Sequence, residues 1–251
     1  MVMLSCIYLN VCAICEFFGT KHAILPNIFT IAYLLNKKTY SILNVIFNFA
    51  PKFMAENIHP IFNSILGRQE KELLLKQKAC VFWFVGLSGS GKSTVAKAVE
   101  KNLHKLGYLT TLLDGDNLRT GINNNLGFSD EDRKENVRRA AEVSKLFLDN
   151  GFITICSLIS PTEEIRQQAI NIIGTDCKIV YINAPFEVCA QRDVKGLYEK
   201  ALKGEIKNFT GLDSPFEAPI NPFIEIKTNE ETLEESTQRL LTAILEVVKI
   251  K

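Results

Sequence analysis

The sequence has few of the features that mark fibrous, disordered or nucleic-acid-binding proteins. Its 251 residues include only 14 Gly and 8 Pro, which excludes a collagen-like or low-complexity chain. The 29 Lys and Arg nearly balance the 28 Asp and Glu, so no overall positive charge favours nucleic acid as a partner. Hydrophobic residues make up 47% and charged residues 23%, which is ordinary for a globular protein. The length allows one domain with an extension, or two small domains.

Patterns for disulfides and metal ligands are also missing. The cysteines number seven, an odd count, and several lie in or beside apolar runs, so we expect reduced, buried thiols in a cytoplasmic protein. Cys12 and Cys15 have the spacing of half a zinc site, but no second pair follows them. The three histidines are scattered and form no ligand pair.

Residues 1–53 differ in composition from the rest of the chain. They are apolar and hold four lysines and one acidic residue, whereas charged residues become frequent from Met54 onward. Three interpretations stay open: an over-extended start, a membrane-associating leader, or an extra structural segment. Glu16 interrupts the first apolar run, and no basic residue precedes Lys21 as a secretory signal requires. We favour an over-extended start, with a working domain at 54–251 and no membrane association.

Predicted strands alternate with predicted helices from residue 68 onward. Strands are expected at 80–85, 109–113, 152–158, 178–183 and 223–227. Helices are expected at 68–78, 92–106, 130–149, 162–173 and 231–249, and another begins near 186. The continuous apolar run at 80–85 is typical of a buried strand in a parallel sheet. The alternation predicts an α/β fold, with a mainly parallel sheet and helices on both faces.

Residues 86–93 read Gly-Leu-Ser-Gly-Ser-Gly-Lys-Ser and match the phosphate-binding pattern G-x-x-x-x-G-K-[ST]. Glycines let backbone N–H groups approach phosphate, and the following helix N-terminus favours an anion. We expect Lys92 to contact the β- and γ-phosphates and the Ser93 hydroxyl to bind Mg²⁺. The flanking strand and helix favour this interpretation over a chance Gly/Ser turn. The sequence therefore predicts a three-layer P-loop NTPase fold that binds ATP and Mg²⁺.

The remaining sequence narrows the class of P-loop protein to a small kinase. Residues 227–231 do not form the Asn-Lys-x-Asp pattern of GTPases, and about 190 residues are too few for a motor. Asp114 and Asp116 follow the second predicted strand, where ligands gather in open α/β sheets. On an extended segment the two side chains would point the same way and could serve metal binding and proton transfer. Turn formation is their alternative role.

A cluster of arginines would suit an anionic acceptor. Arg133 and Asn136 share one face of the helix predicted at 130–149. Arg138 and Arg139 fit better the alternative of a solvated face paired with neighbouring glutamates. Phe128, at the start of this helix, is either a hydrophobic staple or a platform for a stacked base.

Seven motifs together resemble the adenylylsulfate kinase family and cover nearly all of residues 54–251. They are residues 86–94, 114–119, 126–133, 135–139, 159–161, 192–198 and 209–211. The resemblance implies transfer of the ATP γ-phosphoryl group to the 3′-hydroxyl of adenosine 5′-phosphosulfate, giving 3′-phosphoadenylyl sulfate and ADP in sulfate assimilation. It also implies a homodimer.

The resemblance further implies roles for single residues. ATP would be bound by Gly86, Leu87, Ser88, Gly89, Ser90, Gly91, Lys92, Ser93, Thr94 and Arg192. The acceptor would be bound by Asp116, Asn117, Arg119, Phe128, Arg133, Asn136, Ile159, Ser160, Lys195 and Phe209. Lys92, Asp114, Asp116 and Ser160 would be catalytic, and Ser93 and Asp114 would hold Mg²⁺, the latter directly or through water.

The role of Ser160 has two alternatives. By resemblance it occupies the family's phosphoserine position, which implies a covalent intermediate. Direct transfer, however, needs only positioning and charge stabilisation, and a serine at a strand end would then hydrogen-bond the substrate. We expect the second role. Guanidinium groups of Arg119 and Arg133 match phosphosulfate oxygens, and the rings of Phe128 and Phe209 would enclose an adenine.

Residues 196–222 carry three Gly and three Pro and few apolar runs, which predicts a lid that becomes ordered over bound nucleotides. Two other functions stay open. One is a different small P-loop kinase, acting on a nucleoside monophosphate or a sugar acid. The other is a non-catalytic nucleotide-binding module, which the intact Lys92, Asp114 and Asp116 argue against.

Overall fold

The computed structural model describes residues 58–250. The chain divides into two units, Met1–Pro60 and Ile61–Lys251, and the account that follows concerns the second. The segment 1–53 lies outside the described residues, so the interpretations offered for it stay predictions. In the described part, no helix combines the length and the apolar character that a bilayer crossing demands.

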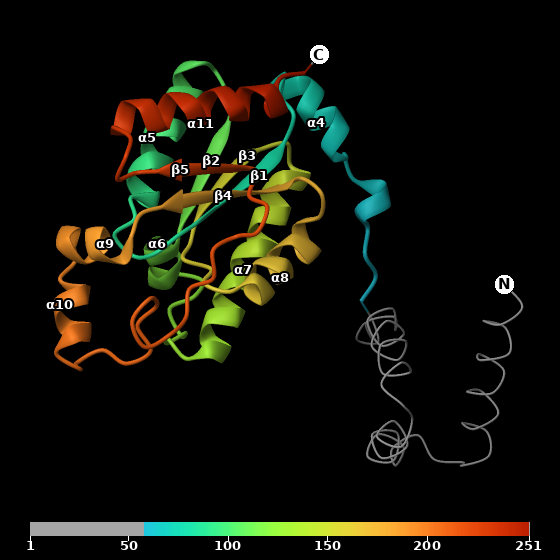
Figure 1. The fold of residues 1–251 in the computed structure, drawn as a ribbon. Helices are drawn as coiled ribbons and strands as arrows, with labels where there is room; N and C mark the ends of the chain where they lie inside the picture. Colours follow the sequence, from blue (N-terminus) through green and yellow to red (C-terminus); the bar gives the residue numbers. More distant parts are fainter. Residues whose placement is uncertain (1–57, 251) are drawn as a thin grey trace, which may run out of the picture. The chain divides into compact units, whose positions relative to one another are not determined.

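Five parallel strands form one sheet in the order β2-β3-β1-β4-β5 (Figure 1). Their bounds are β1 Cys80–Val85, β2 Thr110–Asp114, β3 Ile153–Ser157, β4 Cys177–Asn183 and β5 Ile224–Lys227. Strand β1, the first strand of the described residues, lies in the middle of the sheet, and all six of its residues are buried. A strand covered on both faces needs apolar side chains on both, which explains the continuous apolar run.

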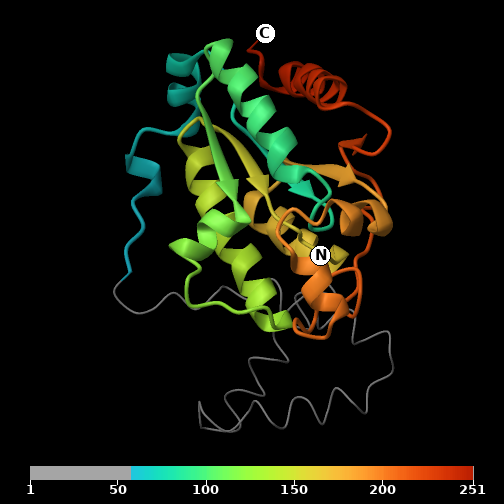
Figure 2. The ribbon, with the colours of Figure 1, turned by 90° about the vertical axis from the view of Figure 1, so that its left-hand side faces the viewer.

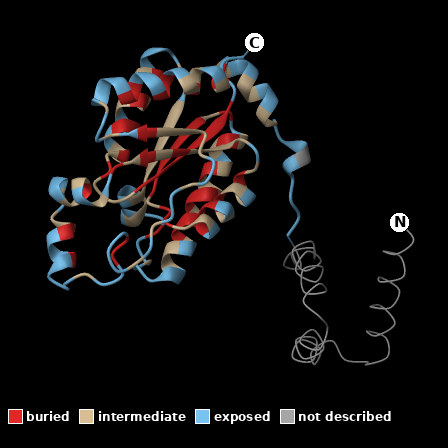
Figure 3. Ribbon diagram, in the orientation of Figure 1, coloured by how far each residue is buried: buried red, intermediate tan, exposed pale blue. Residues whose placement is uncertain are grey.

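Helices cover both faces of this sheet (Figures 1 and 2). One layer contains α5, Lys92–Lys105, and α11, Leu233–Val248, and the other contains α7, Asp130–Asp149, and α8, Glu163–Ile173. Side chains of β1 alternate between two apolar cores: Phe82 packs with α5 and α11, and Trp83 packs with α7 and α8. Figure 3 shows that buried residues concentrate in the strands and on the inner sides of the helices. The predicted three-layer fold is confirmed.

Local signals set several helix ends. The Ser129 hydroxyl accepts a hydrogen bond from the Asp132 N–H at the start of α7. Thr232 and Glu235 form a capping box that begins α11. Gly107, just past the end of α5, has a φ of 86°, a conformation that favours glycine. A short helix α4, Arg68–Leu75, and a 3-10 turn η1, Phe62–Ser64, precede the sheet.

Two short helices differ from the sequence expectation. Helix α6, Gly115–Thr120, begins directly after β2, so Asp116 lies in a helical turn and not on an extended segment. The cause is a cap, because the Asp114 carboxylate accepts the Asp116 N–H at 3.1 Å. Helix α10, Leu197–Leu202, follows α9, Phe186–Arg192, inside the segment expected to be irregular. Tyr198 and Phe209 are buried there with Cys189, so this segment has an apolar cluster of its own.

Candidate active site

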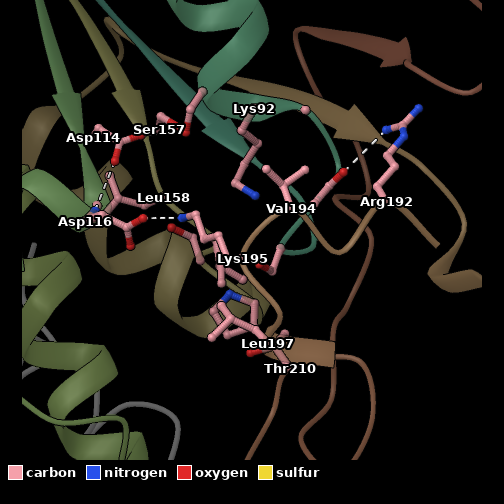
Figure 4. Close-up of a pocket in the computed structure, with 18 of the residues that line it drawn as sticks. Lys92, Asp114, Asp116, Ser157, Leu158, Arg192, Val194, Lys195, Leu197 and Thr210 are labelled. Carbon is pink, nitrogen blue, oxygen red and sulfur yellow. Dashed lines mark hydrogen bonds and ion pairs between the residues drawn. The ribbon is translucent and has the colours of Figure 1, made fainter. Parts of the chain in front are cut away.

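A cleft of about 980 Å³ opens at the carboxyl ends of the central strands. The loop after β1, the ends of β2 and β3, and the segment 192–210 line it (Figure 4). Loops at this edge of a parallel sheet are the usual place for ligands in open α/β folds. The cleft therefore lies where the topology predicts a substrate site.

The phosphate loop is fixed from behind by backbone geometry. Gly86 has a φ of 153°, and a Cβ at this position would lie 2.3 Å from the Ile182 carbonyl oxygen. Only glycine permits this approach. On the other side, the Thr228 hydroxyl donates to the Ser90 carbonyl at 2.7 Å, and Arg192 donates to the Gly89 carbonyl at 3.3 Å. The loop is thus held in place before any nucleotide is present.

Lys92 folds back onto this loop. Its ammonium group donates to the carbonyl oxygens of Gly86 at 2.9 Å and Leu87 at 2.6 Å. The side chain is buried, and burial lowers the pKa of Lys92 to about 8. An arriving phosphate would supply the anionic partner that favours the charged form of the lysine.

Oxygen atoms next to the loop fit a magnesium ion. The Ser93 hydroxyl donates to the Asp114 carboxylate at 2.6 Å, and the Ser157 hydroxyl lies 3.3 Å from that of Ser93. Across residues 58–250, no three His, Cys, Asp or Glu side chains gather to hold a metal. Mg²⁺ bound with a nucleotide takes only one or two protein oxygens and completes its shell with phosphates and water. The donor set present therefore matches a Mg²⁺–nucleotide site.

Two side chains approach one another within the cleft, beside Asp114. Lys195 forms an ion pair with Asp116, and Figure 4 shows the lysine reaching toward the carboxylate. Both side chains are more than half exposed, so the pair is screened by solvent and contributes little to stability. A bound polar ligand can replace either partner at low cost.

Two arginines that line the cleft, Arg119 and Arg133, donate hydrogen bonds to other groups of the protein. Arg133 donates to the Thr210 hydroxyl and to the Asn208 carbonyl, each at 2.6 Å, and so joins α7 to the segment beyond α10. Arg119 donates to the carbonyls of residues 126 and 127, and its guanidinium carbon lies 4.4 Å from the centre of the Phe128 ring. Phe128 is 62% exposed, which favours a stacking platform over a hydrophobic staple.

Arg138 and Arg139 have a different environment from Arg133. Both bond to Glu135, at 2.7 Å and 2.8 Å, and Arg138 also lies 3.6 Å from Glu142. The hydrogen bonds from the two guanidinium groups lower the pKa of Glu135 to about 2. The alternative of a solvated, paired face is therefore confirmed for these two arginines.

Ser160 is buried at the inner wall of the cleft. The indole N–H of Trp83 donates to its hydroxyl oxygen at 2.9 Å, and Arg166 donates to its carbonyl oxygen at 3.0 Å. Nearby, Asn136 is also buried and accepts a hydrogen bond from Asn123 at 2.9 Å. Each of these groups is fixed by a neighbour from a different part of the chain.

The cleft brings together most of the residues predicted from the sequence. Of that set, those that do not line it are Gly86, Leu87, Ser90 and Asn117. Sequence reasoning missed Ser157, Trp83 and Thr228 as contacts of the predicted residues. Ser157 ends a strand next to β1, so the rule that carboxyl ends of parallel strands meet could have found it. The other two contacts depend on side-chain positions that no spacing encodes.

Comparison with known proteins identifies the family. The family model described as adenylylsulphate kinase matches residues 78–227, more than half of the chain. The chain is 58% identical over 190 residues to an adenylyl-sulfate kinase of Bacteroides fragilis, covering 75% of this chain and 94% of that protein. It is 57% identical over 176 residues to one of Clostridium acetobutylicum, covering 70% and 88%.

A solved structure agrees with these relatives. The Mycobacterium tuberculosis APS kinase in complex with AMPPNP and APS is 42% identical, with a TM-score of 0.64, and the match covers 66% of this chain and 98% of that one. The family and the fold expected from the sequence are confirmed. The chain therefore belongs to the adenylylsulfate kinase family, the ATP-dependent enzymes that phosphorylate adenylyl sulfate.

Proposed function

We propose that this protein transfers the γ-phosphoryl group of ATP to the 3′-hydroxyl of adenosine 5′-phosphosulfate within the described cleft. The observation that carries the proposal is that one cleft is lined both by the phosphate loop and by the Asp116–Lys195 pair with Arg133 and Phe128. A donor site and an acceptor site thus face each other. Transfer between two bound nucleotides needs such an arrangement more than it needs covalent chemistry.

At the donor end, we assign ATP to residues 86–94 and Arg192. Lys92 would leave the carbonyls of its own loop and contact the β- and γ-phosphates. Ser93 and Asp114 would hold Mg²⁺, and their hydroxyl and carboxylate oxygens support this assignment. When bound, the ion neutralises charge on the phosphates.

At the acceptor end, we assign the adenine to the faces of Phe128 and Phe209, and the phosphosulfate to Arg119 and Arg133. Both guanidinium groups would exchange carbonyl partners for the anion, which offers charge-assisted hydrogen bonds. We assign to Asp116 the proton of the attacking hydroxyl, because this exposed carboxylate lines the same cleft as the phosphate loop. Asn136, Ile159 and Ser160, which line the cleft, complete the acceptor contacts, whereas Asn117 was predicted as a contact and does not line it.

A direct assay tests the proposal. The purified protein is incubated with ATP and Mg²⁺ and with adenosine 5′-phosphosulfate, AMP or gluconate as acceptor, and the phosphorylated products are separated and quantified. We expect turnover with the phosphosulfate at least 100-fold above that with the other two acceptors, because a built anion site discriminates strongly. Faster turnover with AMP or gluconate would support the alternative kinase, and absence of turnover with all three would support a nucleotide-binding module.

We also propose that the protein acts in the cytoplasm as a homodimer. The state of the cysteines supports the compartment: among the described residues Cys80, Cys156 and Cys189 are buried and unpaired. Burial raises the pKa of Cys80 and of Cys156 to about 12, so neither thiol forms a reactive thiolate at neutral pH. Light scattering during size-exclusion chromatography measures the oligomeric state, and a monomeric mass would contradict the homodimer.

A further inference from the structure

Ser160 has an unusual backbone conformation. Its φ is +43°, in the left-handed region that residues other than glycine seldom adopt. Among the described residues, two other non-glycine residues have φ values above +40°: Lys76, which caps the end of α4, and Asn208, a residue type that tolerates this region. Ser160 lies at no helix end, so the surrounding structure must hold it there.

Two buried side chains hold Ser160 from opposite ends of the residue. Trp83 is fully buried in the middle strand of the sheet, paired to both β3 and β4, and donates its indole N–H to the hydroxyl oxygen at 2.9 Å. Arg166 is 1% exposed and donates to the carbonyl oxygen at 3.0 Å, while Glu163 binds the rest of its guanidinium group. Both the backbone and the side chain of Ser160 are therefore constrained.

The direction of the Trp83 hydrogen bond determines what Ser160 can offer. An indole N–H is only a donor, so the Ser160 oxygen must accept here. A serine hydroxyl has one hydrogen, and within residues 58–250 the Ser160 hydroxyl hydrogen is given to no protein group. Ser160 lines the cleft next to the predicted acceptor residues. The free hydrogen is thus available to an oxygen atom of a ligand in the cleft.

We infer that Trp83 is a positioning residue for the acceptor nucleotide: it fixes the Ser160 hydroxyl as a hydrogen-bond donor to an oxygen of that nucleotide. The inference rests on the proposed function for the identity of the nucleotide. The contact between Trp83 and Ser160 can be measured without it.

A double-mutant cycle tests the inference through Trp83→Phe, Ser160→Ala and the combined variant. Phenylalanine keeps an aromatic ring but removes the N–H donor. We expect Trp83→Phe to raise the KM for adenosine 5′-phosphosulfate about three- to tenfold, the effect of one neutral hydrogen bond, with the KM for ATP changed less than twofold. In the Ser160→Ala background the same substitution should change the acceptor KM less than twofold. An equal loss in both backgrounds, or an equal rise in the KM for ATP, would show a packing role and overturn the inference.

A spectroscopic measurement covers the case in which Trp83→Phe does not fold. Trp83 is the one tryptophan of the sequence, so ¹⁵N-labelled enzyme gives a single indole N–H resonance. Ser160→Ala should shift this resonance, and Thr154→Val should leave it nearly unchanged. Thr154 is a matched control, because its buried hydroxyl on β3 bonds to no protein group.

The same resonance reports on the acceptor. Adenosine 5′-phosphosulfate with ADP should shift it in the wild type and shift it much less in Ser160→Ala. A resonance that Ser160→Ala leaves in place would overturn the inference. If the wild type turned over no adenosine 5′-phosphosulfate, the proposed function would fail and with it the identity of the ligand, while the shift caused by Ser160→Ala would still report the contact.

Discussion

Lys92 has protein partners for its charge in the absence of any nucleotide, because two carbonyl oxygens of its own loop accept its hydrogen bonds. The fold therefore does not depend on a phosphate to satisfy this residue. We propose that Lys92 contributes to catalysis by moving to the transferred group, where charge develops in the transition state.

We predict that Lys92→Ala lowers kcat about 10²- to 10³-fold, the loss expected for one charge-stabilising group in a transition state. The thermal midpoint should change by only a few degrees, because a buried, desolvated cation contributes little net stability. Lys101→Ala is the matched control, since this exposed lysine lies on the same helix away from the loop. A Lys92→Ala enzyme with kcat within tenfold of the wild type would contradict the assigned role.

For Ser160 we predict that the alanine variant keeps at least about a tenth of wild-type activity. One neutral hydrogen bond accounts for roughly 0.5–1.5 kcal/mol. The Ser160 oxygen also accepts a hydrogen bond from Trp83, which makes it a weaker nucleophile. Incubation with γ-labelled ATP and no acceptor gives a second measurement. Stoichiometric label on Ser160, together with an inactive alanine variant, would establish the covalent alternative instead.

At the scale of elements, α7 combines two functions on different sides of its first half. Arg133 faces the cleft and the segment beyond α10, whereas Glu135 binds Arg138 and Arg139 on another side. Arg139 also donates to the Ile122 carbonyl at 2.8 Å, so this network joins α7 to the loop after α6. These hydrogen bonds hold the loop between α6 and α7, which includes Phe128, against α7.

The pKa of Glu135 gives this network a defined pH dependence. Because the folded state lowers this pKa to about 2, the ionised carboxylate stabilises the fold at pH values above the ordinary pKa near 4.5. Glu135→Gln should lower the free energy of unfolding by roughly 1 kcal/mol at pH 7, since exposed ion pairs contribute little. The difference from wild type should shrink as the pH falls from about 4.5 toward 2.

Urea denaturation at several pH values measures this difference. Glu142→Gln is the control, because Glu142 has a single, longer contact with Arg138. A difference between wild type and Glu135→Gln that stays constant down to pH 3 would contradict the pKa assigned to Glu135.

The sequence predicts an element well when the residues that determine it are neighbours in the chain, and poorly when contacts from outside the element determine it. The apolar run of β1 and the Ser129 cap of α7 each lie within a few neighbouring residues, and the observed bounds of these elements match the prediction. Helix α6 was missed because Asp-Gly-Asp-Asn is strong turn chemistry, and the cap formed by Asp114 turns it into a helix start. Helix α10 was missed because its short segment shows no apolar run of its own, and Tyr198 and Ala201 are buried only against Cys189 and Phe209, which lie outside the helix.

The same limit applies to the site. Motif and resemblance identified Lys92, Ser93, Asp114 and Ser160, and all of them line the cleft. The Trp83–Ser160 contact joins residues 77 positions apart, and its direction depends on which face of β1 the indole occupies. Periodicity alone places that side chain in a core, which is correct, and gives no reason to expect a link to the site.

At the scale of the whole molecule, part of the segment 196–222 lines the cleft, and we predict that the segment acts as a lid. Its contacts to the main body include the Arg133 hydrogen bonds and the Tyr198 hydroxyl, which donates to the Ser88 carbonyl at 2.7 Å. Amides of this segment should exchange quickly with solvent in the free enzyme and markedly more slowly with ADP plus adenosine 5′-phosphosulfate. Helix α10, whose Tyr198 and Ala201 are buried, should exchange more slowly than residues 204–222 in both states. Equal protection of the segment with and without ligands would exclude a lid.

The working domain is a second prediction at this scale. We expect a protein of residues 54–251 to be folded and to keep full activity, because every motif of the site lies at or beyond Gly86. Its kcat and its thermal midpoint are compared with those of the 251-residue protein. A loss of more than about half of kcat, or aggregation of the shorter protein, would assign a structural role to residues 1–53.

The hydrogen bond from the Tyr198 hydroxyl to the Ser88 carbonyl connects the segment 196–222 to the phosphate loop. Ser88 belongs to the loop proposed to bind ATP, and Tyr198 lies three residues after Lys195, which is proposed to bind the acceptor. We predict that this contact couples the two ligand sites, and such linkage is reciprocal. Whatever factor ADP contributes to the affinity for the sulfated nucleotide, the sulfated nucleotide must contribute to the affinity for ADP. Titrating the two ligands in either order should thus give the same total binding free energy, and the coupling free energy should be the same whichever ligand binds first.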